Sequence, residues 1–389
     1  MNRILITLFC LSFLMMTSPI ALAADEPKPL DEAHAQQIER AINAGIELQL
    51  TPGAVVVAGR SGGNVYEKGF GHFTYDPNST AVTPETVYDL ASLSKVVGCT
   101  SSIMVLVDQG KISVTDPVSK YIPQMNTPEK KDITIEQCLL HQAGFVPDND
   151  IKDYKGSTEA MLSKVYATKL KNPPGKTSDY SDLSFIVLGE VVKAAGGKPL
   201  KEFAQQNVFG PLGMKSTAYN PPEAWHDRIA PTEKRDGKWI IGEVHDPRAY
   251  ALGGYAGHAG VFASGADVAR FCRMILNKGE LDGRRIVKPE TVALFTKPHS
   301  IKDPKEGTTI TRGLGFDIDS KYSAGPRGKL FPKGQSFGHT GYTGTSFWID
   351  PTHDAFVVLL TNRVHPDDDA DVKALRKRVS TIVAEALMK

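Results

Sequence analysis

The sequence predicts a mixed α/β (α+β) fold in which one antiparallel sheet is built from both ends of the chain. Short runs rich in β-branched residues lie near both ends, and each end also carries a segment with apolar residues at helical spacing. The middle of the chain shows helical spacing broken by Gly and Pro turns. We therefore expect a five-stranded antiparallel sheet flanked by the terminal helices, with an all-helical region inserted into it. The sheet part takes about residues 31–90 and 310–389, and the helical part about residues 91–309.

The N-terminal part predicts a helix followed by a hairpin. Residues 31–50 follow an acidic start and place Ile38, Ile42 and Ile46 on one helical face. Residues 53–72 then carry β-branched and aromatic residues on both sides of a Ser-Gly-Gly turn, which is typical of a hairpin. Its two strands are expected around residues 55–57 and 65–66.

The rest of the chain predicts helices in the middle and further strands near the end. The middle segments with helical spacing are residues 135–140, 158–167, 184–195 and 199–208. The C-terminal strands are expected at residues 313–318, 346–349 and 355–361, and a last helix at residues 370–388.

Length and charge leave most classes of soluble protein open. The chain has 389 residues, enough for one large domain or two smaller ones. Its formal net charge is +1, with acidic and basic residues interspersed, so nucleic acid and anionic membrane surfaces are not expected partners.

The first 23 residues predict a secretory signal peptide. Arg3 precedes an apolar stretch over residues 4–16, and Ala21-Leu22-Ala23 fits a small-x-small cleavage site. The alternative is an uncleaved anchor helix, but Pro19 and its polar neighbours shorten the apolar run. Cys10 follows a large Phe, which disfavours lipidation. We expect a mature domain of residues 24–389 that is periplasmic or secreted and not inserted in a membrane.

Cleavage would leave three cysteines, Cys99, Cys138 and Cys272. A chain of this size can form a core large enough to be stable without disulfide bonds, so buried thiols are expected. One disulfide between two of the three is the alternative.

Ser92 and Lys95 form the only Ser-x-x-Lys in the chain. The apolar residues that follow predict a helix ending before Gly110, so both side chains share one helical face. Unpaired N–H groups at a helix start suit an oxyanion formed during acyl transfer. The alternative is that Ser92 is only a helix cap.

Two later segments supply residue types that this motif lacks. Tyr180-Ser181-Asp182 follows a Pro-Pro-Gly turn, and His339-Thr340-Gly341 opens an alternating apolar run. A serine hydroxyl needs a base to take its proton, and Lys95 and Tyr180 are the candidates. Lysine must lose its charge to act as the base, whereas tyrosine needs a cationic neighbour that holds it as phenolate. Either residue could therefore be the base at this point.

The order of these three motifs resembles the serine β-lactamase and penicillin-binding protein superfamily, in its class C branch with DD-carboxypeptidases and periplasmic esterases. Residues 245–260 and 341–351 also look like segments of that group. The resemblance implies a β-lactamase/transpeptidase-like fold with its site in the groove between sheet and helices. It implies that Ser92 is the nucleophile and that Lys95 and Tyr180 act together.

The same resemblance assigns expectations to the third motif. The backbone N–H of Tyr342 would complete an oxyanion hole with that of Ser92. Thr340 and Gly341 would lie along the substrate, and glycine fits because substrate must approach that edge closely. His339 stands in the lysine position, and with an ordinary pKa of roughly 6.5 it would carry partial positive charge, which predicts pH-sensitive carboxylate recognition. The alternative is that His339 only bonds backbone at a strand edge.

Asp182 departs from the pattern, because that branch usually has Asn there. An ionised carboxylate would keep Lys95 charged and could not donate the amide hydrogen bond to substrate, although a protonated one could donate. His258 and Arg248 either line the groove or pack beside it.

No metal or cofactor is expected. The chain has no paired-cysteine or His-x-x-x-His spacing for zinc, no complete phosphate loop and no Gly-x-Ser-x-Gly elbow.

The sequence thus predicts a serine hydrolase with an acyl-Ser92 intermediate. A D-Ala-D-Ala carboxypeptidase acting on peptidoglycan peptides ranks first, with β-lactams as covalent inhibitors. A carboxylesterase on small acyl esters ranks second, because Asp182 weakens amide recognition. A sensor that binds muropeptides or β-lactams without turnover ranks third, and true β-lactamase activity ranks lower.

Overall fold

The computed structural model describes residues 27–302 and 307–388. The predicted signal peptide, with Cys10, lies outside the described residues, so the expectations of cleavage and secretion stay predictions.

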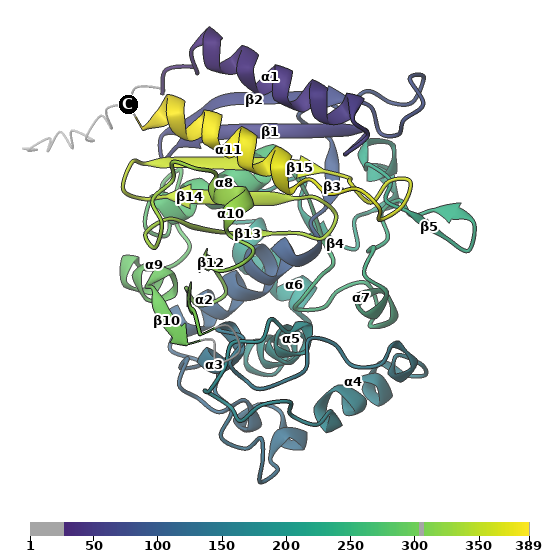
Figure 1. The fold of residues 1–389 in the computed structure, drawn as a ribbon. Helices are drawn as coiled ribbons and strands as arrows, with labels where there is room; N and C mark the ends of the chain where they lie inside the picture. Colours follow the sequence, from purple (N-terminus) through teal and green to yellow (C-terminus); the bar gives the residue numbers. More distant parts are fainter. Residues whose placement is uncertain (1–26, 303–306, 389) are drawn as a thin grey trace, which may run out of the picture.

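An antiparallel sheet of eight strands forms the centre of the fold, in the order β10-β11-β12-β13-β14-β15-β1-β2 (Figure 1). The strands are β1 (Gly53–Arg60), β2 (Gly63–Gly71), β10 (His299–Lys302), β11 (Thr309–Arg312), β12 (Asp317–Asp319), β13 (Phe337–Thr340), β14 (Ser346–Asp350) and β15 (Ala355–Thr361). Because β15 pairs with β1, the two ends of the chain share one sheet, as predicted.

The predicted number of five strands is wrong. β10, β11 and β13 are the additional strands, and each has only four residues. β10 and β11 each have three polar residues out of four, and β13 carries Gly338, so none of them shows the apolar run or alternation by which strands are recognised.

The terminal helices α1 (Glu32–Glu47) and α11 (Lys373–Leu387) lie together on one face of the sheet, and α8 (Gly265–Leu276) packs on the other (Figure 1). Strand β1 shows how its residues divide between the two faces. Val56 packs in the core beneath α1 and α11, whereas Val55 and Val57 belong to the larger core on the opposite side. This alternation follows from the period of two along a strand.

The inserted region holds most of the remaining helices and contains small sheets as well. Its helices are α2 (Ser101–Asp108), α3 (Ile135–Leu139), α4 (Thr158–Ala167), α5 (Asp182–Gly196), α6 (Leu200–Ala204), α7 (Pro247–Ala251) and α9 (Pro289–Thr296). A short helix α10 (Ala324–Arg327) lies between β12 and β13 in sequence. The predicted middle helices are confirmed within a few residues. The prediction that the region is all helical is wrong.

The strands in this region are short. β3 (Val87–Asp89), β7 (Val261–Ser264) and β4 (Ala218–Tyr219) form one antiparallel sheet. Two hairpins add β5 (Lys234–Arg235) with β6 (Lys238–Trp239), and β8 (Glu280–Leu281) with β9 (Arg284–Arg285). β3 matters for function because it leads directly into Ser92.

The helical stretch after β3 crosses the core. Residues Ala91–Asp108 are long and apolar enough to span a membrane, but 83% of this stretch is buried inside the protein. It therefore behaves as the core helix of a folded domain. Cys99, Cys138 and Cys272 are buried free thiols, as predicted, and the disulfide alternative is wrong.

Trp348 on β14 should be a main support of the sheet, because it is fully buried and its indole N–H donates to Ser336 Oγ at 2.8 Å. Trp348→Ala should lower the free energy of unfolding by about 3–5 kcal/mol in urea denaturation. Leu48→Ala is the control, since Leu48 is 70% exposed and should change stability by less than about 0.5 kcal/mol. Equal effects of the two substitutions would contradict this account of the core.

Candidate active site

Ser92 follows a turn that is fixed from several sides. The Asp89 carboxylate accepts the backbone N–H of Ala91 at 2.8 Å and that of His245 at 2.7 Å. Ala91 has a φ of +45°, in the left-handed region that non-glycine residues rarely adopt. Two threonines of the β13–β14 turn hold the same segment, since Thr343 donates to Asp89 O at 2.7 Å and Thr345 to Leu90 O at 3.0 Å. Ser92 is thereby tied to the main sheet.

Beyond Ser92 the helix begins irregularly. Residues Ala91–Leu93 form a 3₁₀ turn, and Lys95–Thr100 form a π-helix before α2 begins. The hydroxyl of Ser101 donates a hydrogen bond to Val97 O, and that of Ser102 donates one to Gly98 O. These bonds give two carbonyls of the π-helix a hydrogen-bond donor. π-Turns are frequent at functional sites, and here one lies directly at Lys95.

Lys95 is fully buried, and its ammonium has three close acceptors. Nζ donates to Ser92 Oγ at 2.9 Å and to His258 O at 3.2 Å, and it lies 2.6 Å from Asp182 Oδ1. Burial acts to lower the pKa of Lys95, but Asp182 and Tyr180 outweigh it and hold that pKa above its usual value. Lys95 is therefore charged at neutral pH.

The hydroxyl of Tyr180 contacts both residues of the Ser-x-x-Lys motif, Ser92 and Lys95. It interacts with Lys95 and with Ser92, and the Lys95 ammonium lies 4.9 Å from the ring centroid. Burial and the Asp182 carboxylate raise the pKa of Tyr180, although Lys95 opposes them. The hydroxyl is thus a neutral phenol in the free protein.

His141 positions the tyrosine and was missed by the sequence analysis. Its ring lies 4.4 Å from that of Tyr180, and its Nδ1 accepts the backbone N–H of Ser181 at 3.0 Å. Burial, with Arg312 and Lys95 nearby, lowers the pKa of His141 well below its ordinary value, so the ring is neutral. The sequence carries no signal for it, because His141 stands alone in a loop.

Asp182 is the first residue of α5, whose N-terminus is capped by the Ser181 hydroxyl. Its carboxylate lies close to Asp246 and His258, which themselves contact at 2.9 Å between Oδ1 and Nε2. These three groups form a donor set that a cation could use. The Lys95 ammonium already lies against Asp182 and supplies positive charge there.

His339, Thr340 and Gly341 end β13 beside this cluster. His339 is buried, and its Nδ1 donates to Thr340 O at 2.8 Å. Burial first, and Lys95 second, lower the pKa of His339 to about 3. The expectation of a partly charged His339 near neutral pH is therefore wrong, and its backbone-bonding alternative describes the residue better.

Gly341 is required by the protein itself. A Cβ on Gly341 would lie 2.4 Å from Leu90 O and 2.1 Å from Thr345 Oγ1, so no side chain fits where the turn meets the segment before Ser92. The sequence analysis attributed this glycine to the approach of substrate. Arg376 of α11 supports the same turn by donating to Gly341 O at 2.8 Å and Thr345 O at 2.9 Å.

Tyr342 follows in that turn and is half exposed. Its hydroxyl donates to Asp368, and its carbonyl accepts Arg363 Nε at 2.7 Å. Within residues 27–302 and 307–388, its backbone N–H has no acceptor. The N–H of Ser92, at the start of a helical turn, likewise has no carbonyl one turn earlier to bond.

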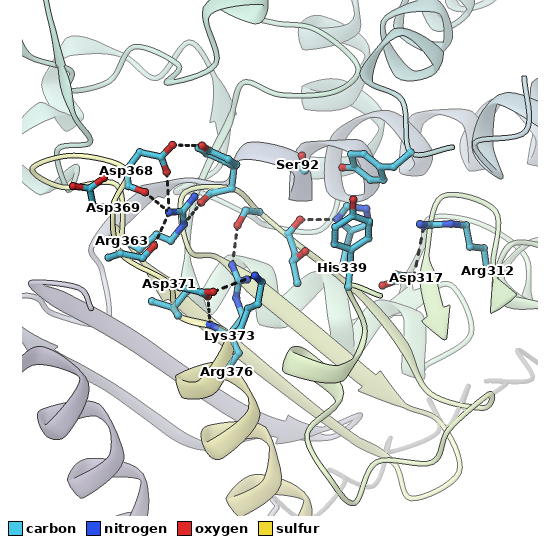
Figure 2. Close-up of a pocket in the computed structure, with 17 residues that line it drawn as sticks. Ser92, Arg312, Asp317, His339, Arg363, Asp368, Asp369, Asp371, Lys373 and Arg376 are labelled. Carbon is cyan, nitrogen blue, oxygen red and sulfur yellow. Dashed lines mark hydrogen bonds and ion pairs between the residues drawn. The ribbon is translucent and has the colours of Figure 1, made fainter. Parts of the chain in front are cut away.

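A pocket of about 550 Å³ opens in front of these groups (Figure 2). Six of the eight predicted site residues line it, namely Ser92, Tyr180, His339, Thr340, Gly341 and Tyr342. Lys95 and Asp182 lie behind Ser92 and do not line it. Figure 2 shows Arg312 and Asp317 beyond His339, and Arg363, Asp368, Asp371 and Lys373 on the opposite side.

His258 and Arg248 do not line this pocket. His258 is buried behind Lys95, and Arg248 donates to Asn149 O at 2.8 Å. Of the two alternatives from the sequence, packing beside the groove describes both.

Arg312 is the other residue that the sequence analysis missed. It ends β11, lines the pocket and is only 3% exposed. Its nearest carboxylate is Asp317, with 3.7 Å between NH1 and Oδ1, and its Nε has no hydrogen-bond partner among the described residues. A buried guanidinium whose Nε has no acceptor and whose ion pair with Asp317 is long can take an anion from the pocket.

The low pKa of His339 predicts how stability responds to acid. The unfolded chain binds a proton on this histidine below about pH 6.5, whereas the folded protein does not until about pH 3. Stability should therefore be lost as pH falls through this window, and His339→Gln should make the decline shallower. Thermal melting of both proteins across the window measures the difference. Parallel curves would contradict a neutral, buried His339.

Comparison with known proteins agrees with the fold and with the motifs. The sequence model of the family described as Beta-lactamase matches residues 38–381. A "putative D-alanyl-D-alanine carboxypeptidase" of Salmonella agona is 32% identical over 329 residues, which cover 77% of this chain and 74% of that protein.

Two solved structures show the same fold at low sequence identity. A penicillin-binding protein homologue from Caulobacter crescentus superposes with a TM-score of 0.74 at 20% identity, covering 94% of this chain and 100% of that one. The D-alanine carboxypeptidase AmpC from Burkholderia cenocepacia gives 0.72 at 18% identity, covering 92% and 99%. The family match over most of the chain, together with this fold, shows that the protein is a serine hydrolase of the β-lactamase and penicillin-binding protein family.

Proposed function

We propose that the protein is a serine-type D-Ala-D-Ala carboxypeptidase that acts on peptidoglycan peptides through an acyl-Ser92 intermediate. The leader-like residues 1–23 support a periplasmic or secreted location, where such peptides occur. The main support for this substrate class is the guanidinium of Arg312, which is buried in the pocket and poorly paired.

A carboxypeptidase must recognise the free carboxylate that ends its substrate. His339 is neutral at physiological pH, so it cannot supply the positive charge. Arg312 can supply that charge, because its guanidinium is always protonated and presents N–H donors in a plane that fits the two oxygens of a carboxylate. A small acyl ester without a carboxylate would leave this buried charge unmatched. The carboxylate of a β-lactam would fit the same position, which supports β-lactams as covalent inhibitors.

The geometry supports an acyl transfer at Ser92. Its Oγ attacks the carbonyl carbon of the penultimate residue, and the backbone N–H groups of Ser92 and Tyr342 donate hydrogen bonds to the resulting oxyanion. Lys95 and Tyr180 move the proton from Oγ to the leaving nitrogen, since both contact Ser92. Thr340 and Gly341 form the edge along which the peptide lies. Water then releases the acyl group from Ser92.

A carboxylesterase on small acyl esters is the alternative, and Asp182 is the residue that favours it. A carboxylate cannot donate the hydrogen bond that an amide side chain would give to a peptide carbonyl. Esters depend less on that contact than peptides do.

Intact mass spectrometry distinguishes these functions. The mature protein, with Ser92→Ala as its control, is incubated with a penicillin and with a pentapeptide ending in D-Ala-D-Ala. We expect a penicillin adduct on Ser92 and loss of D-alanine from the peptide, and neither with the variant. Ester hydrolysis without D-alanine release would favour the esterase. A stable adduct without any turnover would indicate a binding sensor.

Substitution of Arg312 tests the carboxylate contact. Arg312→Gln should lower kcat/KM for the pentapeptide by about 10²–10³-fold, which is the loss expected when a buried charge pair with substrate is removed. Hydrolysis of p-nitrophenyl acetate should change by less than about threefold, because that ester has no carboxylate.

Asp317 provides the matched control, because Arg312→Gln also removes the guanidinium that pairs with its carboxylate at 3.7 Å. The double variant Arg312→Gln with Asp317→Asn should show the same selective loss. An equal loss on the ester and the peptide would assign Arg312 to folding and would remove the main support for a carboxypeptidase.

A further inference from the structure

The end of the pocket beyond His339 holds two buried charges that are loosely paired (Figure 2). Arg312 and Asp317 both line the pocket there, and they are 3% and 2% exposed. They are cross-strand partners of β11 and β12, at a point where the register of the two strands shifts. Because partners in an antiparallel pair lie opposite each other, the sheet itself brings the two charges together.

Each of these two side chains has an atom without a hydrogen-bond partner. Nη1 of Arg312 lies 3.7 Å from Oδ1 of Asp317, which is too long for a hydrogen bond. Among the described residues, Nε of Arg312 has no acceptor and Oδ1 of Asp317 has no donor. The other oxygen, Oδ2, accepts the Ser323 hydroxyl at 2.9 Å, which fixes the carboxylate in place. Buried polar atoms are nearly always paired, so a group that enters from the pocket is the expected partner of both free atoms.

The two free atoms have opposite requirements. A guanidinium N–H needs an acceptor, whereas a carboxylate oxygen needs a donor. A carboxylate alone would pair with Arg312 and would be repelled by Asp317, and an amine alone would do the reverse. A molecule that carries both groups side by side pairs with both residues. An α-amino acid is such a molecule, because its nitrogen lies only about 2.5 Å from its carboxyl carbon.

This pair of residues distinguishes a released amino acid from the peptide that contained it. In a peptide that ends in D-Ala-D-Ala, the nitrogen of the last residue is an amide and carries no charge. Acyl transfer to Ser92 frees this nitrogen as an amine, which is protonated in water at neutral pH. The released D-alanine then has a carboxylate for Arg312 and an ammonium for Asp317. Asp317 thereby gains a charged hydrogen bond that the peptide cannot give.

We propose that Arg312 and Asp317 form a subsite for a free α-amino acid, and that the pocket uses it to hold the D-alanine that the reaction releases. This inference rests on the proposed function, because it takes D-alanine to be the leaving group. Arg312 binds the carboxylate of substrate and product, whereas Asp317 binds the ammonium of the product alone. Tyr322, which precedes Ser323 and lines the same pocket, offers an aromatic surface to the methyl group. D-Alanine is then a competitive inhibitor of the enzyme.

Two ligands of nearly equal size test the subsite. D-Lactate carries a hydroxyl where D-alanine carries its ammonium, and both have the carboxylate. Their binding to the Ser92→Ala protein is measured by isothermal titration calorimetry, so that no turnover interferes. We expect D-alanine to bind about 10–100-fold more tightly than D-lactate, which is the range for a hydrogen bond between charged groups.

Asp317→Asn in the same protein removes the negative charge and keeps the shape of the side chain. D-Alanine and D-lactate should then bind equally to within about threefold, and D-lactate should bind no more weakly than before, because Arg312 keeps its charge. A collapse of the pocket would weaken both ligands. Asp319→Asn is the matched control. Asp319 also lies on β12 but pairs with Arg327 at 2.8 Å and with Lys333 at 3.1 Å, so its loss should leave the preference for D-alanine unchanged.

The ligand pair decides the matter even if Asp317→Asn fails to fold. Equal binding of D-alanine and D-lactate to the Ser92→Ala protein, or no detectable binding of D-alanine, would overturn the subsite. A preference for D-alanine that survives in folded Asp317→Asn would do the same. With the unsubstituted protein, D-alanine should slow acylation by a fluorescent penicillin more than D-lactate does. The proposed function fails on a separate observation, the absence of D-alanine release from the pentapeptide, and a measured preference for D-alanine would then still establish the subsite.

Discussion

The site depends on one constraint, which is the full burial of the Lys95 ammonium. A charge removed from water is tolerated only when acceptors surround it. Its three acceptors come from three separate segments: Ser92 after β3, Asp182 at the start of α5, and the carbonyl of His258 before β7. The ammonium thus contacts parts of the chain that are distant in sequence, and this set of acceptors exists only in the folded domain.

A second set of contacts joins this cluster to the main sheet. The turn between β13 and β14 meets the segment before Ser92 so closely that residue 341 must be glycine, and Thr343 and Thr345 bond that segment's carbonyls. Arg376 of α11 fixes the opposite side of the turn. The N–H of Tyr342 is therefore placed by the C-terminal helix and the sheet, whereas the nucleophile is placed by β3. The C-terminal part of the chain therefore takes part in a site whose nucleophile lies in the middle region.

Local patterns in the sequence predicted the residues that are close together in the chain. Ser92 and Lys95 share a helical face, and their contact follows from spacing alone. The long strands β1, β14 and β15 and the amphipathic helices were predictable for the same reason. The four-residue strands β10, β11 and β13 carry too little pattern, and Arg312 lies at the end of one of them. Its burial results from tertiary packing, as does that of His141. The charge state of His339 was predicted wrongly because its pKa is set by burial and by Lys95, neither of which spacing reveals.

Neutron diffraction of the free protein in heavy water would test the central claim most directly, since it locates exchangeable hydrogens. The account predicts that Lys95 Nζ carries its full set of three deuterons, directed at Asp182, Ser92 and the His258 carbonyl. A neutral amine at Lys95, with fewer than three deuterons on Nζ, would contradict it. The buried charge on which the site depends would then not exist.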